Sequence, residues 1–487
     1  MSDKLIFSFE YNLTFVKQSF CKSQLMEVNT GRSDLLWNYA ASFMRLASAL
    51  IILPLILHLL PVEEVGLWNI MISLNAMIYL LDFGFYQTFS RSVTYIFSGA
   101  KEFKSEGLGD VNQDGSVNYS LLKGSLSAMR VYYAAVAVLL LILLVTAGHL
   151  YIENILADFT GNKDSARIAW YLYGILLCYQ FYTYYYDALL VGKGMIKRSR
   201  QIIVFSQCAH LLLASCLLLM GCGILSMVFG QTLATILNRT LAKRTFYDKK
   251  TKLALKDVFP ADWKRILKIL WTTAYKTGLA NLSWVFTNRM LALIGGLFLP
   301  LAVIGSYGIT KQIVDLTYSL SLIWFTTFFP KLIQHRVTGR EDQAKRIYIK
   351  AQYVAVATFF LISLLVVLLG PWALSVIKSK TPLLESKLLI IFFIASFFEA
   401  FTYLSTSMLI SRNIVPHYKA QMITAVATVV LLVAAFKFLE AGVEALILVP
   451  FIVQLLYQHW KWTSIVYSEL QIRLSDYNPR KYFRLRK

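Results

Sequence analysis

The chain has 487 residues, of which 57% are hydrophobic and only 15% are charged, and its mean hydropathy is +0.57. A soluble chain carries roughly 25% charged residues, so this composition excludes an ordinary soluble domain and indicates repeated membrane spans. The net charge of +21 does not indicate a nucleic-acid-binding protein, because the lysines and arginines fall in short clusters between apolar runs. The five cysteines show no metal-ligand spacing.

Apolar runs separated by charged residues predict an all-α, polytopic membrane protein of about twelve transmembrane helices. Each run is long enough to cross about 30 Å of hydrocarbon. The predicted spans are residues 35–60, 64–88, 127–149, 167–192, 201–221, 223–242, 269–298, 302–328, 350–371, 387–410, 419–438 and 442–463.

The distribution of lysine and arginine predicts the orientation of these spans. With both termini in the cytoplasm, the inner segments hold 38 of these residues and the outer segments hold six. Anionic lipids of the inner leaflet attract such clusters, so the membrane also accounts for the high net charge. We therefore expect a multi-pass protein of the bacterial cytoplasmic (inner) membrane, with membrane lipids and no nucleic acid among its partners.

The second half of the chain repeats features of the first. At an offset of 239 residues, Leu60-Pro61 matches Leu299-Pro300 and Gly66 matches Gly305. Six helices per repeat give two halves of parallel topology, related by a pseudo-twofold axis around a central cavity. The predicted domains are a cytoplasmic segment 1–34, a six-helix bundle 35–242, a basic linker 243–268, a second bundle 269–463 and a basic tail 464–487.

Polar residues form a stripe along the first predicted helix. Asn38, Ser42 and Arg45 recur at i, i+4 and i+7, which places them on one face. The repeat maps Ser42 onto Asn281 in the seventh helix, so both helices are candidates for walls of one cavity. Helix packing accounts for the amide and the hydroxyl, but a charge near mid-membrane costs ~2.5–3.5 kcal/mol, which makes Arg45 a candidate substrate-binding residue.

Three further cations lie within predicted spans. Lys311 in the eighth helix precedes Asp315 by one turn, so it is either a substrate-binding residue or one partner of an intrahelical ion pair. Lys276 and Arg289 share the seventh helix but lie about 140° apart around its axis. In a regular helix, the two cannot both face the cavity. All three are candidate substrate-binding residues.

The fourth and tenth helices carry matching polar faces, with Gln180 and Tyr184 on one and Glu399 on the other. A carboxylate deep in a span can titrate or bind a cation, or it can be neutralised by burial or by a nearby cation. Glu399, Asp315 and Asp187 are therefore the candidates for coupling transport to Na⁺, H⁺ or the membrane potential. The sequence predicts no catalytic residue, metal site or other cofactor.

The sequence shows no nucleophile–base set, no metal-ligand cluster and no phosphate-binding glycine loop, so we do not expect an enzyme. Cations at mid-membrane suit an anionic substrate, and a lipid-linked sugar combines a pyrophosphate, a glycan and a tail that stays in lipid. The residues after 463 are basic and predict a cytoplasmic tail, not a thirteenth span.

Three short motifs in the chain resemble those of a known transporter family. Glu64-x-Gly66-Leu67-Trp68, Asp82-x-Gly84 with Arg91, and Leu190–Gly194 resemble the polysaccharide-repeat-unit flippases of the multidrug/oligosaccharidyl-lipid/polysaccharide (MOP) superfamily. The resemblance implies an O-antigen or capsule exporter that moves undecaprenyl-pyrophosphate-linked oligosaccharide from the inner to the outer leaflet. It implies alternating access through a cationic cavity, with a polysaccharide polymerase and a chain-length regulator as partners.

Two other functions remain open. An ion-coupled multidrug exporter of the same superfamily should carry more lumenal carboxylates than lysines and arginines. A membrane-embedded polysaccharide polymerase or transferase should carry a folded outer loop with acidic or basic site residues.

Overall fold

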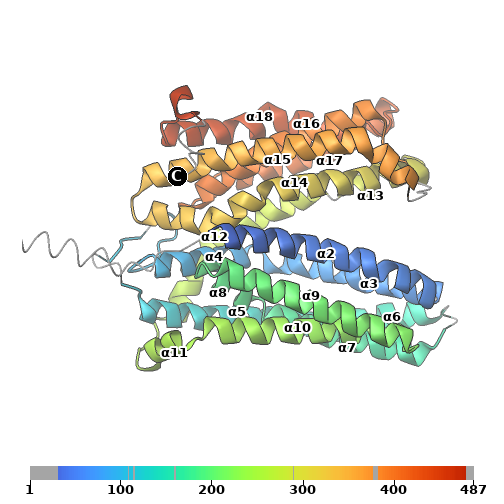
Figure 1. Cartoon of the computed structure of the whole chain (residues 1–487), viewed down its shortest axis with the longest axis horizontal. Helices are drawn as coiled ribbons and strands as arrows, with labels where there is room; N and C mark the ends of the chain where they lie inside the picture. Colours follow the sequence, from blue (N-terminus) through green and yellow to red (C-terminus); the bar gives the residue numbers. More distant parts are fainter. Residues whose placement is uncertain are drawn as a thin grey trace, which may run out of the picture. The chain divides into compact units, whose positions relative to one another are not determined.

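The computed structural model describes residues 31–478, except 108, 113–115, 158, 160, 289 and 377–381. The regular secondary structure of the described part is helical, apart from one isolated β-bridge between Ala100 and Val111. The helices divide between two compact units (Figure 1). Unit 1 comprises the described residues up to Leu81, Tyr86–Trp271 and Val337–Gly339, and unit 2 comprises Asp82–Phe85, Thr272–Arg336 and the described residues from Arg340 onward.

The first half of the chain forms the helices of unit 1. They are α2 (Arg32–Leu59), α3 (Val62–Ile78), η1 (Tyr79–Asp82), α4 (Phe85–Phe97), α5 (Tyr119–Val145), α6 (Ala147–Ala157), α7 (Lys163–Tyr182), α8 (Tyr185–Gly192), α9 (Ile196–Leu219), α10 (Leu225–Phe246) and α11 (Lys249–Lys256).

The second half forms the helices of unit 2, although α12 begins in unit 1. They are α12 (Trp263–Asn288), α13 (Met290–Gly295), α14 (Leu301–Val337), α15 (Glu341–Val376), α16 (Ser386–Ile410), α17 (Tyr418–Phe438), α18 (Ala445–Glu469) and the short η2 (Leu474–Asp476).

Each of the twelve predicted spans falls on one, two or three consecutive helical elements, and the all-α fold in two helical bundles is confirmed. Within the described residues, six helical segments are long and apolar enough to cross a membrane by length and composition alone. Several other spans are interrupted, since the second runs through α3, η1 and α4 and the fourth through α7 and α8.

The predicted loop between the eighth and ninth spans is mostly helical. Residues 331–350 were expected to connect two spans, but α14 continues to Val337 and α15 begins at Glu341. At 1.5 Å per residue, the 36 residues of α15 extend about 54 Å, well beyond a hydrocarbon core of about 30 Å. The basic residues of this region therefore lie on extensions of the spans. The expected outer loop after the third span is likewise helical as far as Ala157.

Two buried carboxylates fix the starts of helices that are distant in sequence. Asp34 of α2 accepts a hydrogen bond of 2.8 Å from the backbone N–H of Lys197, in the first turn of α9. Glu64 of α3 accepts one of 2.8 Å from the backbone N–H of Ile224, the N-cap residue of α10. The first N–H groups of a helix have no partner within the helix, so a carboxylate there stabilises it by about 0.5–2 kcal/mol. Glu64, the first residue of the predicted family motif, thus has a structural role.

The second family motif, Asp82-x-Gly84, forms a turn whose geometry accounts for its glycine. Phe83 and Gly84 both have positive φ angles, of 47° and 80°. A Cβ atom on Gly84 would lie 2.7 Å from the backbone nitrogen of Gly278 in α12. The backbones therefore approach so closely that neither position has room for a side chain.

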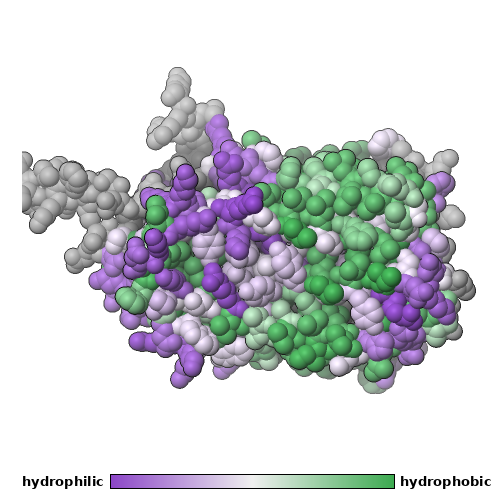
Figure 2. Space-filling view, turned by 90° about the horizontal axis from the view of Figure 1, so that it is seen from below, coloured by the Kyte–Doolittle hydropathy of each residue, from purple (hydrophilic) through white to green (hydrophobic). Residues whose placement is uncertain are grey.

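Large apolar side chains cover the outside of unit 1. On α5, Val138, Leu139 and Ile142 are each half exposed or more. Figure 2 shows a broad apolar band on one face of the molecule, with hydrophilic residues towards both ends. In water such a surface would be unfavourable by roughly 25 cal/mol per Å², so these side chains face lipid.

Candidate substrate-binding site

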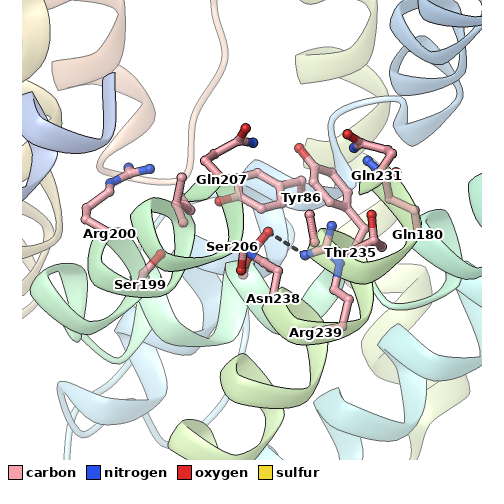
Figure 3. Close-up of a pocket in the computed structure, with 14 residues that line it drawn as sticks. Tyr86, Gln180, Ser199, Arg200, Ser206, Gln207, Gln231, Thr235, Asn238 and Arg239 are labelled. Atoms are coloured by element: carbon pink, nitrogen blue, oxygen red, sulfur yellow. Dashed lines mark hydrogen bonds and ion pairs between the residues drawn. The ribbon is translucent and has the colours of Figure 1, made fainter. Parts of the chain in front are cut away.

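A polar cavity of about 550 Å³ lies inside unit 1, among α4, α7, α8, α9 and α10 (Figure 3). Its lining combines charged groups, amides, hydroxyls and two tyrosine rings. The lining residues are Tyr86, Gln180, Tyr184, Asp187, Ser199, Arg200, Ile203, Ser206, Gln207, Gln231, Ala234, Thr235, Asn238 and Arg239.

A break in the fourth span shapes one wall of the cavity. Helix α7 ends at Tyr182 and α8 begins at Tyr185, so the chain turns at Thr183 and Tyr184. The Thr183 hydroxyl donates to the carbonyl of Tyr179 at 2.7 Å and so satisfies an acceptor beside the break. Tyr184 then stacks on Tyr86 of α4, with ring centroids 4.7 Å apart. The break thus gives the cavity an aromatic surface.

The charges of the cavity are two arginines and one carboxylate. Arg239 of α10 donates to Asp187 of α8 at 2.5 Å, and their side chains are 6% and 22% exposed. The guanidinium of Arg239 also lies 5.7 Å from the centre of the Tyr184 ring. Arg200 of α9 lines the same cavity. The lining residues therefore include two arginines and one carboxylate.

The neutral polar groups supply many hydrogen-bond donors and acceptors. Four amide side chains line the cavity, and each offers a carbonyl and an NH₂ group. Within the described part of the chain, the buried hydroxyl of Ser206 and the side-chain carbonyl of Asn238 have no protein hydrogen-bond partner. Buried polar atoms are usually paired, so these two atoms are suited to a polar ligand. Together with the arginines, they match a polyhydroxylated, anionic molecule.

The predicted residues of the first helix lie on α2 in unit 1. Asn38 is buried, and the Ser42 hydroxyl donates to the Asn38 backbone carbonyl at 3.0 Å, one turn earlier. This bond lies within α2 and satisfies the hydroxyl locally, so the roles of Asn38 and Ser42 stay predictions. Arg45 lies within α2, but its side chain is outside the part that the structure describes. Its role stays a prediction.

In unit 2, Glu399 of α16 lies at the centre of a hydrogen-bonded group. Its carboxylate accepts from the Trp284 indole N–H at 2.7 Å and from the Asn288 amide at 3.0 Å, both on α12. A cavity of about 20 Å³, roughly the volume needed for one water molecule, is lined by the same two α12 residues and by Thr402. Thr402 is hydrogen-bonded to His459 at 2.8 Å.

Two of the three predicted cations of unit 2, Lys311 and Lys276, have partners. Lys311 forms an ion pair with Asp315 at 3.0 Å and lies 5.7 Å from the centre of the Phe392 ring. The intrahelical pair that the sequence allowed is therefore present. Lys276 lies 5.8 Å from the centre of the Tyr418 ring, within cation–π distance.

The other two predicted residues of this half are less informative. Asn281 is exposed, and Arg289 lies outside the described residues. Within the described ranges, no three His, Cys, Asp or Glu side chains converge to hold a metal ion.

The structure adds cavity residues that the sequence analysis did not select. Gln180, Tyr184 and Asp187 were identified as a polar face, but Arg200 and Arg239 were assigned to the basic inner segments. A signal was present in the sequence. Positions 231, 235, 238 and 239 of α10 recur at one-turn and two-turn spacing, as do positions 199, 200, 206 and 207 of α9. Polar residues at such spacing within an apolar helix indicate a polar cavity.

No protein-family model matches the sequence, and the curated proteins searched contain no match. Solved structures do match. One is MATE in complex with MaL6, with a TM-score of 0.66, 12% identity, and coverage of 92% of this chain and 99% of the other. Another is an outward-facing multidrug resistance MATE family transporter of the MOP superfamily, with a TM-score of 0.62, 13% identity, and coverage of 90% and 94%.

A third similar structure is a MOP superfamily transporter from Pyrococcus furiosus, described as having a binding pocket of reverse polarity that suggests a different function. Its TM-score is 0.61 at 11% identity, with coverage of 93% of this chain and 99% of the other. At such low identities, the likeness establishes the fold. This chain has the fold of the MOP superfamily transporters and is a multi-pass membrane protein.

Proposed function

We propose that this protein is a flippase for an anionic lipid-linked oligosaccharide. It moves undecaprenyl-pyrophosphate-linked repeat units, of the O-antigen or capsular type, from the inner to the outer leaflet of the bacterial cytoplasmic membrane. Both termini are cytoplasmic in this proposal.

The observation that carries the proposal is the composition of the cavity in unit 1. Its lining holds two arginines against one carboxylate, together with four amides and two tyrosine rings. Arginine recognises phosphate and carboxylate groups through several N–H donors in a fixed geometry, and amides bond sugar hydroxyls in either direction. Aromatic rings offer apolar faces to sugar rings. A hydrophobic cation would bind poorly to this lining, because the arginines repel it and the polar groups offer it few apolar contacts.

The depth of the cavity fits entry from the cytoplasmic side. Arg239 lies seven residues before the end of α10, and Gln207 lies eleven residues after the start of α9. At 1.5 Å per residue, these positions are about 10 Å and 16 Å from the inner helix ends. A headgroup entering there travels about half of the ~30 Å hydrocarbon core. The arginine-rich inner ends of the helices favour the approach of an anionic headgroup.

Energy for export is available without a nucleotide. With the cell interior negative, moving an anion outward is favourable by about 2.3 kcal/mol per charge per 100 mV. Glu399, held by Trp284 and Asn288, is the coupling residue of the proposal, with Asp315 next to Lys311 as the second candidate. A carboxylate within a span changes its charge when it binds H⁺ or Na⁺.

The second candidate function is an ion-coupled multidrug exporter. The multidrug resistance MATE family transporter with the same fold favours it. The polarity of the unit 1 cavity favours the flippase, because a cationic drug would meet two arginines and a single carboxylate that is already paired. The Pyrococcus furiosus protein, described as having a pocket of reverse polarity, supports polarity as the feature that separates functions on this fold.

Deletion of the gene, followed by analysis of lipid-linked intermediates, tests the proposal. The flippase predicts that complete repeat units accumulate on the inner leaflet and that surface polysaccharide is lost. The exporter predicts normal polysaccharide and increased sensitivity to cationic drugs. A plasmid-borne Arg200→Gln variant at wild-type protein level should fail to restore polysaccharide, whereas the wild-type gene restores it.

A further inference from the structure

The segment that follows α10 is basic and carries apolar side chains on its surface. Six lysines and one arginine lie between residues 249 and 268, all of them exposed, against three aspartates in residues 248–268. Within the same stretch, the Leu253 side chain is 71% exposed and that of Phe259 is 90% exposed. An apolar side chain this exposed is expected in a mobile loop or at a surface that contacts lipid.

The segment is firmly attached to the bundle, which argues against a mobile loop. The Lys123 ammonium of α5 donates to the backbone carbonyls of Leu255 and Val258, at 3.0 and 2.8 Å. The Ser120 hydroxyl donates to the carbonyl of Phe259 at 2.7 Å. The backbone that carries Phe259 is therefore fixed, although its ring packs against almost nothing within the chain.

The other side of α11 is attached to the loop between α8 and α9. Lys193 donates to the Thr251 hydroxyl at 2.9 Å and lies 3.6 Å from the Asp248 carboxylate. Burial lowers the pKa of Lys193, and the Asp248 carboxylate opposes that change. Thr251 and Leu255 are buried, so α11 presents one face to the bundle and the opposite face, with Leu253, to its surroundings.

The attachment point places the segment at the level of lipid headgroups. The contacts are with Ser120 and Lys123, in the first two turns of α5, and exposed apolar residues begin on that helix at Val131. The distance from Lys123 to Val131 along the helix is about 12 Å, so the segment lies outside the lipid-facing apolar part of α5 and close to it. Trp263, with Lys264 5.8 Å from its ring centre, is typical of this interface. Figure 2 shows hydrophilic residues, interspersed with a few apolar ones, at the end of the face where α11 lies in Figure 1.

We propose that residues 249–262 form an interfacial anchor that binds the anionic phospholipids of the inner leaflet. The exposed lysines bind headgroup phosphates, and Leu253 and Phe259 enter the boundary between headgroups and acyl chains. Each basic residue near an anionic membrane surface adds to the binding free energy. Inserted apolar side chains add to it in proportion to the apolar area that they bury. The occupant is a bilayer because positive charge and apolar side chains occur together on one fixed surface.

Amide hydrogen exchange of the full-length protein in lipid nanodiscs tests the proposal. In nanodiscs of an anionic phospholipid, backbone amides of residues 249–262 should exchange at least about tenfold more slowly than in zwitterionic nanodiscs, since each lysine near the surface contributes. Adding inorganic phosphate to the zwitterionic nanodiscs should give no such protection. Protection by phosphate alone would identify a free-anion site and overturn the membrane anchor.

Two variants separate the parts of the proposal. Replacing Lys249, Lys250, Lys252 and Lys256 with glutamine should abolish the difference between the two lipids, and Phe259→Ser should reduce it severalfold. The matched control replaces Lys101 and Lys104, exposed basic residues of another inner segment, in whose described residues no large apolar side chain is exposed. In that control variant, residues 249–262 should keep the full protection by anionic lipid. Unchanged protection in the glutamine variant, equal exchange in both lipids, or the same loss in the Lys101/Lys104 control would overturn the proposal. Native exchange in α9 and α10 verifies that each variant is folded.

Discussion

The ion pair between Asp187 and Arg239 allows a quantitative test of the cavity in unit 1. Arg239 is 6% exposed and Asp187 is 22% exposed. Asp187→Asn keeps the shape of the side chain but leaves a buried guanidinium without its countercharge. Removing one partner of a buried pair costs about 3–5 kcal/mol, and the partial exposure of Asp187 reduces this to about 2–3 kcal/mol. Arg239→Gln should cost less, about 1 kcal/mol, because water reaches the remaining carboxylate more easily.

The double variant should be more stable than the sum of the single variants predicts, by about 1–2 kcal/mol. The measurement is the free energy of unfolding in detergent micelles, followed by circular dichroism across a denaturant series for all four proteins. Additivity to within about 0.5 kcal/mol would show that the two side chains do not interact, and it would refute the assigned charge balance of the cavity.

Three further predictions follow from single contacts. Arg200→Gln should weaken binding of the lipid-linked oligosaccharide about tenfold, because it removes one partly exposed charge-assisted hydrogen bond to the substrate of about 1.5 kcal/mol; equal affinity in a titration of the purified protein would remove Arg200 from the site. Gly84→Ala should lower the amount of folded protein severely, since the new Cβ would meet the Gly278 backbone at 2.7 Å, and a normal melting temperature would contradict this contact. Asp34→Ala should destabilise the protein by about 1 kcal/mol through loss of its bond to the Lys197 N–H, and faster amide exchange confined to the start of α9 would support that cause.

Apolar length determined most of what the sequence could predict. A helix that must cross the hydrocarbon needs about 20 apolar residues, and each such run fell on helical structure. Interruptions were not visible, because Thr183 and Tyr184 break the fourth span without glycine or proline. The extensions of α14 and α15 were not predicted, because their charged ends were interpreted as loops. Charged residues also form helices readily in water, so charge alone does not indicate a loop.

The candidate site was predicted in part. Gln180, Tyr184 and Asp187 were recognised as one polar face because helical spacing depends on a single chain segment. Arg239 was assigned to the basic inner segment, although it lies on a turn of α10 that faces Asp187. Tertiary packing decides which face of α10 contacts α8, and the hydropathy of the sequence does not predict that packing. Glu399 was recognised as unusual from its depth, but its partners Trp284 and Asn288 required the structure.

Substrate choice by the reconstituted protein tests the central claim most directly. Purified protein in liposomes should move an undecaprenyl-pyrophosphate oligosaccharide from one leaflet to the other, measured by its accessibility to an externally added sugar-modifying enzyme. A lipophilic cationic dye in the same liposomes should not be transported, and Arg200→Gln should slow the oligosaccharide. Transport of the dye with no movement of the oligosaccharide would contradict the account and identify a multidrug exporter.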